Sequence, residues 1–370
     1  MTRRIVQIIP TLDQGGAEKQ LTLLASGLDR SEFDVHVIAL TRSGPLAARL
    51  EAAGVPLTVI GKRWKIDPFA YRRLEAELRR LRPDLVQTWL FAANSYGRVA
   101  ARRAGVKRII AGERCVDPWK RWHELAIDRR LAQFTDRIVV NSSGVREFYV
   151  SRGLPAEKFT VIPNGIPPAP PATKSREESR AALRAELGLP QNAKLIALVG
   201  RLWPQKRVKD AIWATDLITF AGRECHVLVI GDGPQRDRLE RYRMQVGVEK
   251  YVHFLGHRSD VPEVLAGCDL LWLTSEYEGM PNSIMEAMQA GLPVVATNIA
   301  GSADLVVEGE TGFLVPVGDR QELASRTYRL FDDPDAATKL GAAGRARIAQ
   351  EFSVAAMTNR FAELYRELLD

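Results

Sequence analysis

The chain has 370 residues, of which 46% are hydrophobic and 26% charged, and its net charge is +7; these values exclude a disordered chain and allow two domains of ordinary size. It has no apolar run of the ~18 residues that span a membrane, and its first hydrophobic stretch is too short for a secretory signal. Its three cysteines form no CxxC pair, which excludes a zinc-ribbon site and favours free thiols in a reducing cytoplasm.

Strands alternate with helices along the first part of the chain. The expected strands are residues 4–9, 35–40, 57–60, 85–89, 107–111, 137–141 and 159–162. The expected helices are residues 17–28, 45–53, 71–82 and 94–104. This alternation predicts right-handed βαβ units and a parallel sheet.

A proline-rich segment, PNGIPPAPP at residues 163–171, then interrupts the pattern. Such a sequence is stiff and extended, which is typical of a linker between domains. We therefore expect one domain over residues 1–168 and a second over residues 169–352.

The second domain repeats the alternation after a helix over residues 177–187. Its expected strands are residues 195–199, 226–230, 252–255, 270–274, 293–297 and 313–315. Ligands of parallel sheets bind at the carboxyl ends of the strands. Two such halves joined by a hinge predict a ligand in the cleft between them.

The stretch Ser275–Gly301 is the strongest candidate for a ligand site. A strand ends, a loop follows, and a helix begins near Pro281, so that the unpaired N–H groups of its first turn and its dipole favour an anion. Two carboxylates, Glu278 and Glu286, flank this turn. A simpler interpretation of Glu286 is a capping box with Ser283, in which the glutamate satisfies a backbone N–H group.

Two glycine-bearing loops follow strands of the second domain. In the first, Gly200 is followed by Arg201 and Lys206, a combination that suits a diphosphate because glycine admits the ligand and the cations bind its oxygens. Solvated surface charge is the alternative. The second loop, GDGP at residues 231–234, begins like a dinucleotide fingerprint but has Arg236 in place of the third glycine, so a tight turn is expected.

The positive charge is concentrated in the first half, where residues 1–165 contain 28 Lys and Arg against 17 Asp and Glu. This imbalance favours an anionic partner such as a membrane surface or a phosphate-bearing acceptor, with a solvated cationic face as the alternative. The single D-x-D pattern, Asp333–Asp335, is far in sequence from the expected cleft, and the five histidines show no ligand spacing. We therefore expect no metal site.

Taken together, these motifs resemble glycosyltransferase family four, a retaining group with the GT-B fold. The stretches that carry the resemblance are GGAE at 15–18, PNGI at 163–166, GRLWPQK at 200–206, GDGP at 231–234 and EGMPNSIME at 278–286. The resemblance implies an α/β protein with two Rossmann-like parallel-sheet domains facing each other across a cleft. It further implies that the first domain is on the acceptor side, that the second binds the sugar nucleotide, and that a last helix, about residues 353–370, packs back on the first domain.

The resemblance also implies roles for individual residues. Glu278, Arg201 and Lys206 are the expected catalytic residues. The expected donor-binding residues are Gly15, Gly16, Gly200, Arg258, Gly279, Met280, Pro281, Asn282, Ser283 and Glu286. No metal or other cofactor is expected, because the two cations and the helix end stabilise the departing diphosphate.

The acceptor side departs from the family pattern. Many relatives carry histidines in an H-T-W-L-x-H stretch, whereas this chain has QTWLFA at residues 87–92. The remaining acceptor-side candidates are Asn94, Glu113, Arg114 and Asp117, with His123 as a more distant one.

We thus expect a metal-independent, retaining hexosyltransferase that moves a sugar from a UDP- or GDP-sugar to a hydroxyl of a lipid-linked or cell-surface glycan. The basic first domain with Trp64, Trp119 and Trp122 predicts docking to an anionic membrane, with a cytoplasmic, peripheral location and no nucleic acid partner. Two alternatives remain open. One is a sugar-nucleotide 2-epimerase of the same fold, and the other is a non-catalytic protein that binds sugar nucleotides.

Overall fold

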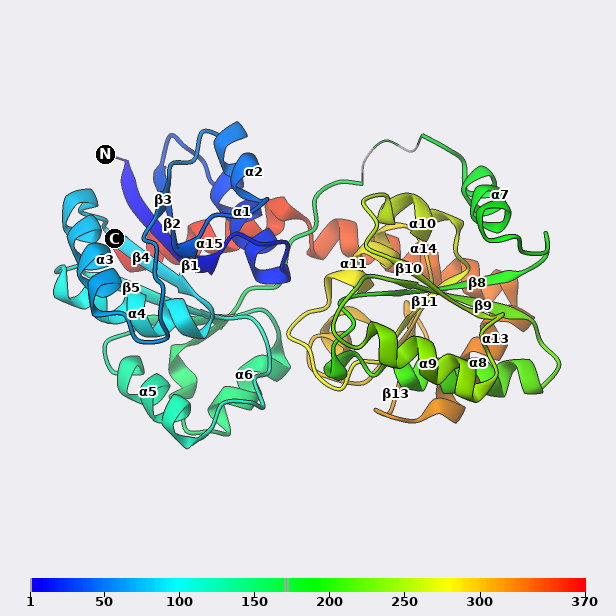
Figure 1. Cartoon of the computed structure of the whole chain (residues 1–370). Helices are drawn as coiled ribbons and strands as arrows, with labels where there is room; N and C mark the ends of the chain where they lie inside the picture. The colour runs from blue at the N-terminus through cyan, green and yellow to red at the C-terminus, as the bar shows by residue number, and fades with distance from the viewer. Residues whose placement is uncertain (1, 170, 172) are drawn as a thin grey trace. The chain divides into compact units, whose positions relative to one another are not determined.

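The computed structural model describes residues 2–169, 171 and 173–370, and the chain divides into two compact units (Figure 1). Unit 1 comprises the chain up to Pro167 together with Phe352–Asp370, and unit 2 comprises Pro168–Glu351. One residue of the predicted linker, Pro170, lies outside the described residues. Each unit is a parallel sheet covered by helices, which confirms the predicted α/β class.

The described part of unit 1 contains a seven-stranded parallel sheet in the order β3-β2-β1-β4-β5-β6-β7. Its strands are β1 (Arg3–Thr11), β2 (Phe33–Arg42), β3 (Leu57–Val59), β4 (Leu85–Trp89), β5 (Arg108–Glu113), β6 (Arg137–Val140) and β7 (Phe159–Val161). Its helices are α1 (Gly16–Gly27), α2 (Ala47–Ala52), α3 (Pro68–Leu81), α4 (Leu90–Arg103), α5 (Trp122–Ala132), α6 (Ser143–Val150), a 3₁₀ turn η1 (Ala156–Lys158) and α15 (Val354–Leu369).

The strand order of unit 1 reverses between β1 and β4. The chain runs outward from β1 through β2 to β3 and then returns to place β4 on the other side of β1, where Ile5 is paired with Leu85. Such a reversal leaves a crevice at the carboxyl ends of the two strands, which is the usual ligand site of an open parallel sheet. The loops after β1 and β4 are therefore the ones best placed to contact a ligand.

Two helices of unit 1 begin earlier than the sequence pattern indicated. Helix α3 starts at Pro68 because the Asp67 carboxylate accepts a hydrogen bond from the Ala70 N–H group and Pro68 suits the first helical position. Helix α4 starts directly at the end of β4, and Leu90 adopts φ +67 in this sharp turn. A left-handed conformation is uncommon for leucine, so the turn at the reversal point of the sheet is strained.

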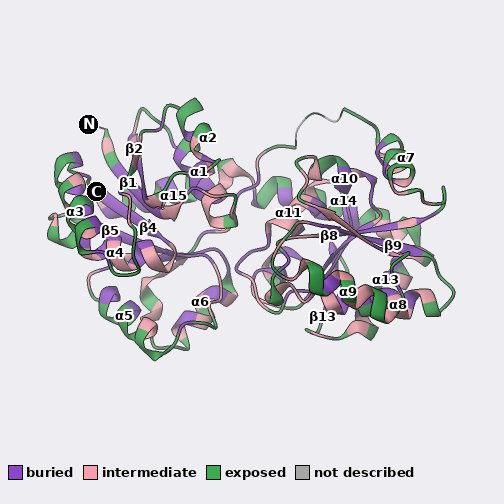
Figure 2. Cartoon of the chain, viewed as in Figure 1, coloured by how far each residue is buried: buried purple, intermediate pink, exposed green. Residues whose placement is uncertain are grey.

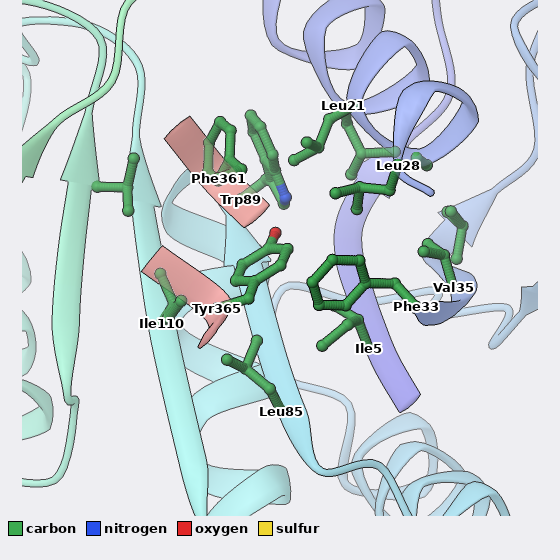
Figure 3. Close-up of a cluster of buried hydrophobic side chains, with 14 of the residues drawn as sticks. Ile5, Leu21, Leu28, Phe33, Val35, Leu85, Trp89, Ile110, Phe361 and Tyr365 are labelled. Carbon is green, nitrogen blue, oxygen red and sulfur yellow. The ribbon is translucent and has the colours of Figure 1, made fainter. Parts of the chain in front are cut away.

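The end of the chain completes the core of unit 1 (Figure 3). Helix α15 places Phe361 and Tyr365 among buried side chains of the sheet, and the Tyr365 ring meets Phe33 edge-to-face. The buried Tyr365 hydroxyl donates to Gln87 Oε1 (2.6 Å) and accepts from Gln7 Nε2 (2.8 Å). This helix therefore belongs to the core of the unit and is not a surface addition.

The chain leaves unit 1 and re-enters it at one place. Ile166 pairs with Ser353 in an isolated parallel bridge, with the Ile166 N–H group donating to Phe352 O (2.8 Å). Beside this bridge, the Gln20 side chain makes two hydrogen bonds with the backbone of Gly165, at 2.9 and 2.8 Å. Through Gln20, helix α1 thus holds the segment around Gly165, where the chain leaves unit 1.

The described part of unit 2 contains a six-stranded parallel sheet in the order β10-β9-β8-β11-β12-β13. Its strands are β8 (Lys194–Val199), β9 (Cys225–Ile230), β10 (Val252–Gly256), β11 (Leu270–Leu273), β12 (Val294–Thr297) and β13 (Gly312–Val315). Its helices are α7 (Arg176–Leu187), a 3₁₀ turn η2 (Pro204–Lys206), α8 (Val208–Phe220), α9 (Arg236–Val246), α10 (Val261–Gly267), α11 (Asn282–Gln289), α12 (Ser302–Leu305), α13 (Arg320–Asp332) and α14 (Pro334–Glu351).

In unit 2 the strand order reverses between β8 and β11, which are paired at Ile196 and Leu270. The strands of both units are mostly buried, whereas the helices expose their outer faces (Figure 2). Burial on both faces explains why the strands appear in the sequence as continuous apolar runs and not as alternating ones. The loops after β8 and β11 are those that the sequence marked as a ligand site.

Candidate functional site

Two loops of unit 2 meet at the reversal point of its sheet. The loop after β8 contains Gly200–Lys206, and the loop after β11 contains residues 274–281. The Glu276 N–H group donates to Gln205 O (2.8 Å), and the Thr274 hydroxyl donates to Lys206 O (2.7 Å). The backbone of one loop therefore holds the other in place.

The same two loops bring two predicted catalytic residues together. Lys206 Nζ lies 2.5 Å from Glu278 Oε1, which also accepts a hydrogen bond from the Ser275 hydroxyl (2.8 Å). Their side chains are only 17% and 12% exposed, so this ion pair is shielded from much of the solvent. The third predicted catalytic residue, Arg201, is exposed on the first loop with its guanidinium 5.9 Å from the Trp203 ring centre.

Helix α11 begins at the end of the second loop. Pro281 is its N-cap residue and supplies no side-chain hydrogen bond, so Asn282 and Ser283 lie in the first turn. The capping box considered for Ser283 and Glu286 is not formed, because Ser283 lies inside the helix and not at the N-cap. Glu286 is partly exposed on the second turn of α11, so the predicted capping box with Ser283 is wrong.

Gly301 supports the loop ahead of α11. Its φ is +77, and a Cβ atom at this position would lie 1.9 Å from the carbonyl oxygen of Gly279 and 2.7 Å from Cα of Met280. A glycine is therefore needed for the close approach of the two backbones. The loop that contains the predicted donor-binding residues Gly279 and Met280 is held from behind by this contact.

The GDGP loop after β9 supports the loop after β8. A Cβ atom on Gly231, whose φ is +132, would lie 2.1 Å from Gly200 O, and one on Gly233 would lie 2.7 Å from Leu202 O. The Leu202 N–H group donates to Asp232 O (2.9 Å). The sequence predicted a tight turn here but not that the turn supports the loop after β8. The available signal was the pair of glycines, Gly231 and Gly233, at the carboxyl end of a strand.

Arg258, a predicted donor-binding residue, makes ion pairs within unit 2. Its guanidinium donates to Asp260 Oδ2 (2.6 Å) and to Glu186 Oε1 (2.5 Å) on α7. The hydrogen bonds that Arg258 donates to Asp260 and then to Glu186 raise the pKa of Arg258. This residue follows β10, at the edge of the sheet, and its ion pairs go to Asp260 and to α7 rather than to the two loops at the reversal point. Its donor-binding role stays a prediction.

Gly15 and Gly16, the predicted donor-binding residues of unit 1, lie at the start of α1. Gly15 is the N-cap residue with extended backbone, and Gly16 is the first helical residue. They follow β1, so they stand at the reversal point of the unit 1 sheet. A ligand that approached this edge would meet the N-terminal N–H groups of a 12-residue helix.

Three of the four acceptor-side candidates belong to one buried network in unit 1. Asn94 Nδ2 donates to Glu113 Oε1 (2.9 Å) and to Gly112 O (3.0 Å), while its carbonyl accepts from the Thr88 hydroxyl (2.7 Å). These bonds use both donors and one of the two acceptor sites of a fully buried amide, so Asn94 positions Glu113. Asp117 joins the network through Tyr149, whose hydroxyl lies 2.9 Å from Asp117 Oδ2.

The network also contains residues that the sequence did not suggest: Arg98, Lys120, Asp128 and Tyr149. Lys120 Nζ is fully buried and lies 2.9 Å from Asp128 Oδ2 and 3.1 Å from Glu113 Oε1. Burial alone would lower the pKa of Lys120, but the carboxylates of Glu113, Asp128 and Asp117 raise it above its usual value.

Burial raises the pKa of Glu113, although Lys120 opposes the shift. The Tyr149 hydroxyl lies 3.1 Å from Glu113 Oε2, and burial also raises the pKa of this phenol. One hydroxyl proton therefore faces two carboxylates. The Tyr149 hydroxyl has only one proton, so it donates to Glu113 or to Asp117 at any one time.

Arg114 lies apart from this network. Its Nη2 atom donates to Asn164 Oδ1, its guanidinium lies 5.0 Å from the Trp89 ring centre, and it is 7% exposed. His123, the more distant candidate, is exposed on α5, where its Nε2 atom lies 2.7 Å from Glu124 Oε1.

An aromatic surface on unit 1 includes the three predicted tryptophans. It consists of exposed side chains from the loops after β3 and β5 and from the first turns of α3 and α5: Trp64, Ile66, Phe69, Trp119 and Trp122. Helix α4 joins the two loops, because the Tyr96 hydroxyl accepts from the Asp67 N–H group (2.7 Å) and the Phe91 ring meets Trp119 at 5.5 Å. In the part of the chain that the structure describes, no helix is long and apolar enough to cross a membrane, and no group of His, Cys, Asp or Glu could hold a metal ion.

Comparison with protein families matches both units. The Glycosyltransferase Family 4 model covers residues 14–169, and the model named Glycosyl transferases group 1 covers residues 179–347. The two models thus adjoin and together span most of the chain.

Three related proteins match over nearly their whole length. A UDP-Gal:α-D-GlcNAc-diphosphoundecaprenol α-1,3-galactosyltransferase of Escherichia coli is 27% identical, covering 98% of this chain and 96% of that protein. Crystal structures of Anabaena Alr3699/HepE with UDP and with UDP-glucose are 25% identical; the UDP complex has a TM-score of 0.86 and covers 98% of this chain and 100% of that one. A glycosyltransferase structure from Rickettsia africae, 19% identical with a TM-score of 0.86 over 100% and 99% of the chains, shares the fold.

Proposed function

Because the chain belongs to glycosyltransferase family 4 and is a nucleotide-sugar glycosyltransferase, we propose that it transfers a hexose from a UDP- or GDP-sugar to a hydroxyl with retention of configuration and without a metal ion. UDP is the favoured nucleotide, since the Anabaena relative binds UDP and UDP-glucose. The observation that carries the proposal is the Lys206–Glu278 pair beside the start of α11, at the reversal point of the unit 2 sheet.

Each charged group at this point has a distinct task. Lys206 and the exposed Arg201 bind the diphosphate oxygens and neutralise the charge that develops as the diphosphate departs. The N–H groups at the start of α11 bind the same anion, which removes the need for a metal ion. Glu278 accepts hydrogen bonds from hydroxyls of the donor sugar, and Glu286 accepts them from the ribose.

The reaction follows from where the leaving group is held. The bond between C1 of the sugar and the phosphate oxygen breaks, and the acceptor oxygen forms a new bond to C1 on the same face. The acceptor proton passes to the departing phosphate oxygen, so the step requires no separate base. Retention follows because the two oxygens share one face of the sugar ring.

The acceptor in this proposal is a lipid-linked or cell-surface glycan. Lysine and arginine side chains lie in the same loop as the exposed Trp64 and Ile66, a pairing of cations and apolar side chains that suits the headgroups of an anionic bilayer. The Escherichia coli relative, by its name, acts on a sugar attached to diphosphoundecaprenol. Both observations support a peripheral position on the cytoplasmic face of a membrane.

A thermal-shift and product screen against UDP-, GDP-, ADP- and TDP-sugars, with and without EDTA, tests the proposal. One nucleotide is expected to raise the melting temperature equally in EDTA, and Lys206→Ala or Glu286→Ala should abolish the shift. Lys250→Ala, at an exposed position ahead of β10, is the matched control and should keep it. Binding that requires Mg²⁺ or Mn²⁺ contradicts the metal-free proposal. A product with an epimerised donor sugar favours the epimerase, and binding without turnover favours the non-catalytic alternative.

A further inference from the structure

Arg114 is a buried cation whose charge is not matched by a carboxylate in the described residues. It is 7% exposed, its Nε and Nη1 atoms have no hydrogen-bond partner there, and its one side-chain bond goes to the neutral amide of Asn164. The other buried cations of unit 1 differ sharply. Arg98 and Lys120 both lie within 2.9 Å of Asp128 carboxylate oxygens.

Such an arrangement is costly for a structural residue. Each buried donor that loses water without gaining a partner destabilises the fold, and a buried charge without a counter-charge does so more strongly. Burial lowers the pKa of Arg114 to about 9, so the guanidinium still carries its charge at neutral pH. The missing partner of a guanidinium in this state is an oxyanion.

The position of Arg114 also points to a ligand. Arg114 directly follows β5, and its neighbours come from the carboxyl ends of the three other strands on this side of the sheet. Trp89 is the last residue of β4, Asn141 follows β6, and Asn164 follows β7. The Asn141 side chain donates to Arg114 O (3.1 Å), and the Trp89 ring lies 5.0 Å from the guanidinium. Three strand ends thus hold Arg114 at the edge where ligands of parallel sheets bind.

We propose that Arg114 binds an oxyanion of the acceptor, so that the enzyme selects acceptors with a phosphate, diphosphate or carboxylate near the attacking hydroxyl. The assignment rests on the proposed function, because it names the acceptor chemistry of that same reaction. It also gives the planar guanidinium an oxyanion partner, since a bidentate pair uses the edge that Nη2 shares with Nε or with Nη1, and neither of these two nitrogens has a partner in the described residues.

Inorganic pyrophosphate is the first probe, titrated into the full-length protein saturated with UDP so that the donor position is filled. Wild type is expected to bind it, and Arg114→Gln to weaken its affinity about 10- to 100-fold with UDP affinity unchanged. Arg114→Lys keeps the charge without the planar fork and should retain part of the affinity. Arg121→Gln removes an exposed arginine just ahead of α5 and should match wild type.

The outcomes separate this inference from the proposed function. If no sugar nucleotide binds, the proposed function fails. If UDP binds but wild type and Arg114→Gln have the same response to pyrophosphate, the Arg114 assignment fails and the proposed function stands. Normal UDP binding by each variant shows that it has folded, and Arg114→Lys provides the comparison should the glutamine variant not fold.

Two acceptors with the same terminal sugar then distinguish the source of the oxyanion. One is an N-acetylglucosaminyl lipid diphosphate, and the other is the octyl glycoside of the same sugar. Arg114→Gln should raise KM about tenfold or more for the diphosphate acceptor and leave KM for the octyl glycoside unchanged. A higher KM for the donor instead, with acceptor KM values unchanged, overturns the assignment to the acceptor.

Discussion

Lys206 Nζ lies 2.5 Å from Glu278 Oε1, and this ion pair joins two residues that are 72 positions apart in the sequence. Each residue follows a different strand, and the two strands are neighbours only because the sheet order reverses between them. The pair therefore has two tasks, since it holds two loops together and supplies charge to the proposed site.

A double-mutant cycle separates these tasks. Lys206→Ala and Glu278→Ala each leave a largely buried charge without its partner, and each is expected to cost about 1–3 kcal/mol in the free energy of unfolding. The double variant should recover part of this stability because no unpaired charge remains. Its sugar transfer should stay absent. Urea unfolding and a transfer assay on the four proteins provide the measurements, and activity that recovers with stability would contradict the catalytic assignment.

Gly231→Ala tests the support of the Gly200–Lys206 loop from behind. The new methyl group would lie 2.1 Å from Gly200 O in a backbone with φ +132, so the loop must move. KM for the sugar nucleotide is expected to rise about tenfold or more. Gly247→Ala is the matched control, because its φ is +82 but nothing lies within 4 Å of the new Cβ; it should cost only about 1–2 kcal/mol of backbone strain. Equal KM values in the two variants would refute the supporting role.

Lys120→Met is expected to destabilise unit 1 by about 3–5 kcal/mol, because it removes the cation that pairs with both Glu113 and Asp128 and leaves only Arg98, which pairs with Asp128. Lys107→Met, at an exposed position ahead of β5, should change stability by less than about 0.5 kcal/mol. The defect should be smaller at acid pH, where Glu113 is readily protonated. Thermal unfolding at neutral and acid pH checks both statements, and a pH-independent defect would show that packing and not charge is responsible.

The stability of unit 2 is expected to fall at acid pH because of His253. Burial, and then the neighbouring His226 and Arg243, lower its pKa from 6.5 to about 4. The unfolded chain therefore binds the proton more readily, so the stability linked to this residue is present above pH 6.5 and lost as the pH falls towards 4. The loss amounts to about 2 kcal/mol, since solvent partly screens the ring. His253→Phe should flatten the pH dependence of urea unfolding, whereas His257→Gln, at an exposed position, should not.

The aromatic surface predicts binding to anionic vesicles. Wild type should co-sediment with phosphatidylglycerol vesicles more than with phosphatidylcholine vesicles, and added salt should weaken the binding because it screens the basic side chains. Replacing Trp64 and Ile66 by serine should reduce the bound fraction about tenfold or more, since both side chains are exposed. Phe220→Ser, which changes an exposed side chain of unit 2, is the control. Equal binding of both variants would exclude the surface as the docking site.

The sequence was most informative where the chemistry is local. Apolar runs alternating with helices predicted both parallel sheets, and the motifs around Gly200 and Glu278 indicated the loops that meet at the reversal point of unit 2. Asp67 and Pro68 are also local signals for the start of α3, but the apolar spacing predicted a start at Tyr71. Local signals of this kind can be read along the chain because neighbours in sequence make the contacts.

Contacts between distant residues were not predictable in this way. Lys120 lies in the loop before α5, Asp128 lies in α5, and Tyr149 lies in α6. No pattern along the chain shows that these side chains gather around Glu113. The capping box at Glu286 failed for a related reason, since Pro281 and not Ser283 is the N-cap residue of α11. Residues 283–286 have the capping-box pattern, but the preceding loop decides where the helix begins, and the pattern does not predict the geometry of that loop.

The bridge between Ile166 and Ser353 has a consequence for the ancestry and engineering of such chains. Both crossings of the chain pass through one hydrogen-bonded pair, so residues 168–351 form an insert whose two ends emerge side by side from the host unit. Inserts with adjacent ends are readily exchanged by recombination, because the host closes around the same two anchor points. A chimaera that replaces this insert with that of a relative should therefore retain the host core built around Tyr365 while inheriting a new nucleotide and sugar preference.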